Sequence, residues 1–106
     1  MITIAVGKQI NKIDVKKHLN LENTIFIEEI ERGYHYTEYK KAWQALIKTN
    51  LDYLVTTQSL EMIKALCELD CDFEVIRFDQ DEFGLHTTRF SSKEAKFLIN
   101  EGLEIR

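Results

Sequence analysis

The chain of 106 residues contains no proline, only four glycines and only two cysteines, so residues that interrupt helices and strands are scarce. It also has no internal repeat, no low-complexity segment and no stretch that reads as a linker. We therefore expect a single domain over residues 1–106, which is a common domain size and is long enough to bury one core.

Long apolar runs are missing as well. No stretch approaches the roughly 20 apolar residues that a membrane-spanning helix needs. The first residues, MITIAVGKQINK, show no charged leader followed by a long apolar run, so they do not read as a secretory signal. These absences predict a cytoplasmic protein that has no membrane partner.

Metal-binding side chains are few and scattered. Cys67 and Cys71 are four positions apart, whereas His18, His35 and His86 are spread along the chain. A zinc site usually needs four closely placed cysteine or histidine ligands, so this pattern does not predict one. We expect two reduced, partly buried thiols, as is usual in the cytoplasm.

The charge balance is acidic, with 14 lysines and arginines against 18 aspartates and glutamates and a formal net charge of -4. A net anion is not attracted to phosphate surfaces, so nucleic acid is not expected as a direct partner. One basic group is expected to form a solvated face: Lys8, Lys12, Lys16 and Lys17.

Apolar runs and helical periodicity alternate along the chain. Buried strands are predicted at 2–6, 24–27 and 53–56, followed by a hairpin whose strands are 73–78 and 85–90, with a turn over 79–84. Helices are predicted from the cap Asp14 through 19, at 36–49, from the cap Ser59 through 67, and at 93–100. The expected caps are Asp14, Ser59 and the Ser91–Glu94 capping box, with Asn50 and Gly102 as helix ends.

This order predicts a three-layer α/β fold with a mainly parallel sheet, crossover helices and a C-terminal antiparallel hairpin plus helix. One helix face is expected to pack on the core or an interface rather than to stack on bases. Its residues are Tyr36, Tyr39, Trp43, Leu46 and Ile47.

Three segments share an order and spacing with one ATPase family. They are TIFIEEIERGYHY at 24–36, TTQS at 56–59 and RFSSKEAKFLINEGLEIR at 89–106. Together they resemble the C-terminal half of ABC-type ATPases related to the RecF and OLD (overcoming-lysogenization-defect) proteins. In that family a pattern like DEIENGLHY precedes a Trp-bearing helix, a strand and TTHS. The resemblance implies a P-loop NTPase-like half that carries a Walker B strand.

The resemblance also implies roles for individual residues. Glu28 takes the magnesium-binding position, and Glu29 takes the catalytic carboxylate position. Gln58 takes the position of the switch histidine. Gly33 and His35 fall in a loop that lies at the interface between two ATPase domains in the family.

The phosphate-binding loop of such an ATPase is not matched. The nearest segment contains Gly7 and Lys8, but Gln9 stands where a serine or threonine should bind magnesium, and only one glycine is present. Carboxylates at 28, 29 and 31 would repel a nucleotide, since like charges about 4 Å apart near a protein surface interact by roughly 4 kcal/mol. No cofactor is therefore expected in isolation, although the resemblance makes magnesium and ATP possible.

Three functions fit these observations. The leading one is a degenerate ATPase domain that acts as a regulatory or protein-interaction module and pairs with itself or with a complete ATPase. The alternative is a magnesium-dependent ATPase or nuclease-like subunit that borrows a P-loop from another chain. A third is a small interaction protein whose ATPase ancestry no longer matters. The simpler interpretation of the residues themselves is that the carboxylates only form a solvated edge, that His35 packs on Tyr36, and that Gln58 and Ser59 serve as strand end and helix cap.

Overall fold

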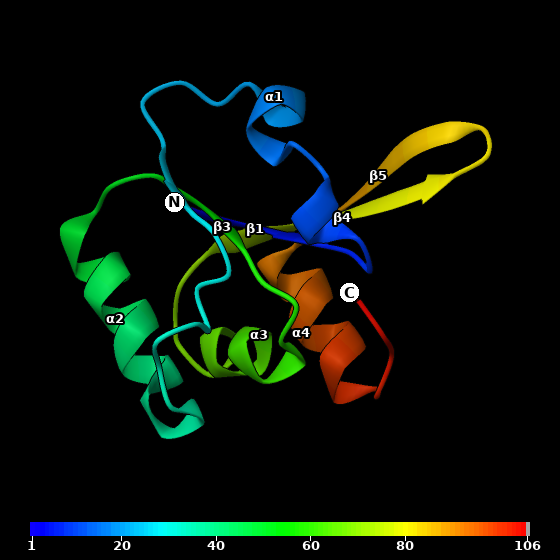
Figure 1. Cartoon of the computed structure of the whole chain (residues 1–106). Helices are drawn as coiled ribbons and strands as arrows, with labels where there is room; N and C mark the ends of the chain where they lie inside the picture. The colour runs from blue at the N-terminus through cyan, green and yellow to red at the C-terminus, as the bar shows by residue number, and fades with distance from the viewer. Residues whose placement is uncertain (106) are drawn as a thin grey trace.

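A computed structural model describes residues 1–105. Its five strands form one sheet in the order β2-β3-β1-β4-β5 (Figure 1). The strands are β1 (Ile2–Val6), β2 (Ile25–Ile27), β3 (Tyr53–Thr56), β4 (Phe73–Asp81) and β5 (Gly84–Ser91). The first four strands are parallel to one another, and β5 pairs antiparallel with β4.

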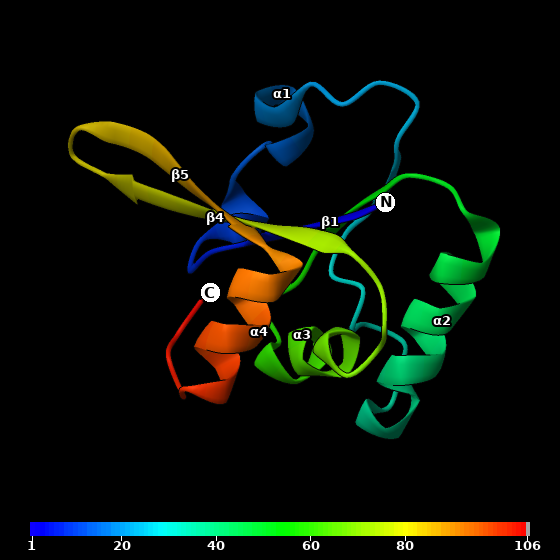
Figure 2. The same cartoon turned by 180° about the vertical axis from the view of Figure 1, so that it is seen from behind.

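Helices cover both faces of the sheet, although unequally (Figures 1 and 2). One face carries α2 (Tyr39–Thr49), α3 (Leu60–Cys67) and α4 (Ser92–Asn100). The other carries only the short α1 (Val15–Leu19) and the 3-10 turn η1 (Ile10–Lys12). The predicted three-layer α/β fold, with its parallel sheet and C-terminal hairpin plus helix, is therefore confirmed.

The larger core lies between the sheet and α2, α3 and α4. Trp43 of α2 is completely buried there, and its indole Nε1 donates a hydrogen bond to the backbone oxygen of Met62 at 2.8 Å. This bond ties α2 to α3 and satisfies the only polar atom of the ring. A smaller core under α1 contains Ile10, Val15, Leu54, Ile76 and Phe78, together with Ala5.

The helix ends follow the predicted caps. The Asp14 and Ser59 side chains accept hydrogen bonds from backbone N–H groups three positions ahead, and Ser91 with Glu94 forms a complete capping box. Asn50 ends α2 in the left-handed conformation. Each cap supplies a partner for a backbone group that the helix itself leaves unpaired. Among residues 1–105 we find no helix with the length and apolar character needed to span a bilayer.

The helix predicted from Tyr36 begins three residues later than expected. Residues Tyr36–Glu38 form a separate 3-10 turn, η2, in front of α2. The tighter turn rotates the Tyr36 ring away from the core face, and the ring is 68% exposed. Ile47 is also exposed, so of the two predicted alternatives, core or interface, neither Tyr36 nor Ile47 takes the core, whereas Tyr39, Trp43 and Leu46 pack on it.

The predicted turn over 79–84 is also too long. Asp81 pairs with Gly84, which leaves only Glu82 and Phe83 in the loop. Residues 79–81 are polar, whereas a strand that packs on a core carries apolar residues, and the polar run is therefore typical of a turn. Here β4 continues past the end of β1, where Val6 pairs with Arg77, and the hairpin projects from the body of the domain (Figures 1 and 2).

Candidate functional site

Three loops meet at the edge of the sheet where the parallel strands end. Because β3 lies between β2 and β1, the segments that follow these strands are neighbours. They are Gly7 and Lys8 after β1, residues 28–31 after β2, and residues 57–59 after β3. This edge is where open α/β sheets usually bind ligands, and it gathers most of the predicted site residues.

Backbone hydrogen bonds join the loop after β2 to the end of β3. The Glu29 N–H donates to the Thr56 hydroxyl oxygen at 2.8 Å, and the Ile30 N–H donates to the Thr56 carbonyl oxygen at 3.2 Å. Glu29 has a left-handed backbone, with φ 47, which is uncommon for a residue other than glycine or asparagine. The chain therefore turns sharply at Glu29, and Ile30 enters the core.

Glu31 completes this connection through its side chain. Its Oε2 accepts hydrogen bonds from the Thr57 hydroxyl at 2.7 Å and from the Gln58 backbone N–H at 3.1 Å. Its Oε1 is buried and has no hydrogen-bond partner within residues 1–105. Glu31 is thus the carboxylate that faces the end of β3, and describing the whole acidic run as a solvated edge is wrong.

The two carboxylates predicted as site residues lie in different surroundings. Glu28 is exposed. Glu29 is partly buried and forms an ion pair with Arg32, with 2.7 Å between Glu29 Oε2 and Arg32 Nε. Within residues 1–105, no cluster of three or more histidine, cysteine, aspartate or glutamate side chains could hold a metal ion.

Gly7 has a structural reason to be glycine. A Cβ atom at this position would lie 2.4 Å from the carbonyl oxygen of Phe78, which is far inside van der Waals contact. Its φ of 153 is also one that side chains rarely allow. The close approach of β1 to β4 therefore accounts for this glycine without any phosphate-binding role.

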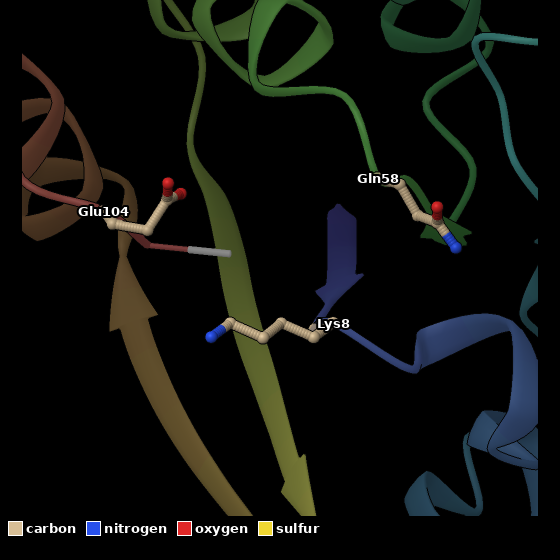
Figure 3. Close-up of a pocket in the computed structure, with 4 residues that line it drawn as sticks. Lys8, Gln58 and Glu104 are labelled. Carbon is tan, nitrogen blue, oxygen red and sulfur yellow. The ribbon is translucent and has the colours of Figure 1, made fainter.

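Two clefts open at this edge of the sheet, and Gln58 lines both. The first has a volume of about 300 Å³ and is lined by Gly7, Lys8, Gln58 and Glu104. Lys8 extends across it with its ammonium group on the Glu104 side, and Gln58 lies on the opposite side (Figure 3). The second has a volume of about 330 Å³ and is lined by Glu29, Glu31, Arg32, Gln58 and Ser59.

The loop after β2 continues into an exposed aromatic segment. The rings of His35 and Tyr36 lie 4.5 Å apart between centroids, so His35 packs on Tyr36 as the simpler interpretation expected. His35 Nδ1 also accepts a hydrogen bond from the Thr37 N–H at 3.4 Å and caps η2. Gly33 has open space around it, and Tyr34 is 48% exposed. The predicted interface residues therefore lie on an accessible loop.

Sequence reasoning missed Glu104 and the special position of Glu31. Glu104 comes from the chain end, and only the packing of Ile105 into the larger core brings it to the first cleft. Glu31 is visible in the sequence as part of the acidic run, but the turn at Glu29 that brings it to the end of β3 has no sequence signal. Cys67 and Cys71 are free and partly buried, as expected.

Comparisons with protein-family models, curated proteins and solved structures found no match for this chain. The family resemblance, and the site roles that depend on it, therefore stay predictions.

Proposed function

We propose that this chain is a non-catalytic interaction module built on the Walker B half of an ABC-type ATPase. It would act by binding a complete ATPase through the loop over residues 28–38. One observation carries the proposal: this loop is held firmly to the end of β3 and presents two exposed tyrosines.

Exposed aromatic rings are suited to protein recognition. Tyr34 and Tyr36 are 48% and 68% exposed, and they flank His35. Tyrosine is enriched among the residues that contribute most to protein–protein affinity, since it offers a large apolar area with few rotatable bonds. Because hydrogen bonds at Glu29 and Glu31 fix the base of the loop, binding would not have to order that part of the chain.

The site residues are also engaged in ways that oppose nucleotide binding by the chain alone. Gly7 is required by its contact with Phe78, and Glu29 is paired with Arg32. Glu31 and Glu104 add negative charge to the two clefts. An anionic phosphate would meet repulsion there, without a glycine-rich nest of N–H groups to offset it.

An NMR titration tests the absence of a nucleotide site. We expect millimolar Mg-ATP to leave the amide signals of Gly7, Lys8 and Gln58 unshifted in the labelled chain. Saturable shifts at these amides with a micromolar midpoint would contradict the proposal. Magnesium alone serves as the control for nonspecific cation effects on the acidic surface.

A binding measurement with a purified complete ABC-type ATPase from the same cell tests the interaction. We expect Tyr36→Ser to weaken binding by roughly fivefold or more, because a tyrosine at the centre of an interface contributes over about 1 kcal/mol. Phe97→Ser is the matched control, since it also removes an exposed ring, at 61% exposure, but on α4. Equal affinities for the wild type and Tyr36→Ser would reject the loop as the binding surface.

A second candidate is an ATPase subunit completed in trans by a chain that bears a P-loop. The buried and unpartnered Oε1 of Glu31 favours it, since a ligand donor or a cation in the second cleft would satisfy that oxygen. In a reconstituted mixture this function requires Glu29→Gln to lower ATP hydrolysis strongly. Unchanged hydrolysis would reject this candidate and would not affect the proposed interaction module.

A further inference from the structure

The strand β5 has a long open backbone edge. Within residues 1–105 it pairs with β4 alone, so the outer side of its eight residues is available for hydrogen bonding. The opposite edge strand, β2, has only three residues. A long exposed edge is a template for another strand, and proteins usually block such edges.

The usual blocking devices are absent from β5. It contains no proline, and its two charged or titratable side chains are engaged within the hairpin. Arg89 forms an ion pair with Glu74, and the His86 ring lies 3.3 Å from Asp81 Oδ1. Thr87 and Thr88, exposed at the middle of the strand, carry no charge that would repel a second strand.

An apolar groove lies beside the base of this strand, between β5 and α4. It has a volume of about 430 Å³ and is lined by Phe90, Lys93, Glu94, Phe97 and Leu98. Phe97 is 61% exposed although it lines the groove. The fold thus leaves apolar surface uncovered next to the open edge, which is typical of a binding surface.

The other end of β5 carries an aromatic ring that could fill this groove. Phe83 occupies the hairpin tip and is 83% exposed. Thr87 lies midway between Phe83 and Ser91, the residue that precedes α4. If two β5 strands pair antiparallel with Thr87 opposite Thr87, the tip of each hairpin comes level with the groove of the other. A peptide of another sequence would not bring this ring.

The charges of this region permit two copies to meet. From 73 to 100, a range that covers the whole hairpin and α4, there are four basic and five acidic residues, and the side chains of Glu74, Asp79 and Asp81 lie against Arg89, Arg77 and His86, respectively. The net charge of -4 is therefore not concentrated here. Lys93 and Glu94, on the rim of the groove, have opposite signs, so the rim is compatible with its own copy.

We propose that two copies of this chain pair through their β5 edges about a two-fold axis. The pairing extends the sheet across both protomers and places Phe83 of one protomer at the groove of its partner. An axis perpendicular to the sheet keeps the α4 helices of both protomers on the same face. The contact is isologous, because the same surface of each protomer supplies both the ring and the groove.

Sedimentation equilibrium over a concentration series tests this pairing. We expect the wild type to reach twice its mass of 12.5 kDa as its concentration rises. The double variant Thr87→Lys, Thr88→Lys is expected to stay at 12.5 kDa, because like charges then face each other across the axis. Phe83→Ser should weaken dimerisation about tenfold or more, and it lies in a solvent-exposed turn where it cannot disturb the core.

Tyr36→Ser is the control that separates this surface from the loop over residues 28–38. It should leave the dimer unchanged, and Trp43 fluorescence should show that every variant is folded. A wild type that stays monomeric up to about millimolar concentration would overturn the inference, since a specific contact exceeds that affinity. A dimer that survives the double lysine variant would also overturn it.

Discussion

Replacing Gly7 by alanine should strongly destabilise the protein. The new Cβ would lie 2.4 Å from the Phe78 carbonyl oxygen, whereas ordinary contacts begin near 3.4 Å. The end of β1 or the adjacent part of β4 must therefore move by about 0.6–1.0 Å. These strands pair over five residues and form the centre of the sheet, so the movement spreads into both cores.

The expected loss is about 3 kcal/mol in the free energy of unfolding. Overpacking of this kind costs roughly 1–3 kcal/mol, and the unfavourable φ adds about 1 kcal/mol. Small domains have only about 5–15 kcal/mol of stability, so the effect is a large fraction of the total. The melting temperature should fall by about 10–20 °C.

Urea unfolding followed by Trp43 fluorescence measures this loss, because Trp43 is the only tryptophan and is completely buried. Gly102→Ala is the matched control. Its φ of 73 also disfavours alanine, but its Cβ would meet no atom within 4 Å. The control should lose no more than about 1–2 kcal/mol. If both variants lose the same small amount, the close approach of Gly7 to Phe78 is refuted.

Further predictions concern the carboxylates and the thiols. Glu31→Ala should lower the free energy of unfolding by about 1–3 kcal/mol, because the Thr57 hydroxyl and the Gln58 N–H lose their acceptor. Glu28→Ala, at an exposed position, should change it by less than about 0.5 kcal/mol, and equal losses in urea unfolding would refute the role of Glu31. Burial raises the pKa of Cys67 to about 11, so at pH 8 its thiolate should be about 100-fold scarcer than that of an ordinary cysteine. In a Cys71→Ser variant, iodoacetamide should therefore label Cys67 much more slowly in the folded chain than in urea, and equal rates would contradict this burial. The backbone N–H groups of Phe83 and Ser91 lower the pKa of Asp81 and Glu94, respectively. Because a lowered folded-state pKa stabilises the fold above the unfolded pKa, this contribution should be lost as the pH falls below about 4. Asp81→Asn and Glu94→Gln should make acid unfolding less steep in pH, and an unchanged acid transition would count against both contacts.

Local patterns were enough to predict the five strands and four α-helices of this fold, although not all of their ends and not the 3-10 turns. The runs at 2–6 and 53–56 are apolar because parallel strands are buried on both faces, and the structure places strands at those residues. Asp14, Ser59 and Ser91 cap helices because their side chains reach backbone groups only three positions away. Such signals depend on neighbours in the sequence, so the sequence alone determined the α/β class.

The candidate site depended on contacts between distant segments. Glu31, and not Glu28, meets the end of β3 because the backbone turns at Glu29 with a positive φ, which no periodicity reveals. The reason for Gly7 appears only when β4 lies beside β1.

The exposed rings were also decided by tertiary structure. Tyr36 leaves the core because a 3-10 turn replaces the first turn of the expected helix. Phe83 and the groove beside Phe90 lie at opposite ends of one strand, and the sheet order leaves that strand at an open edge. Periodicity is a property of one segment, whereas an edge or a cleft exists only after several segments have packed together.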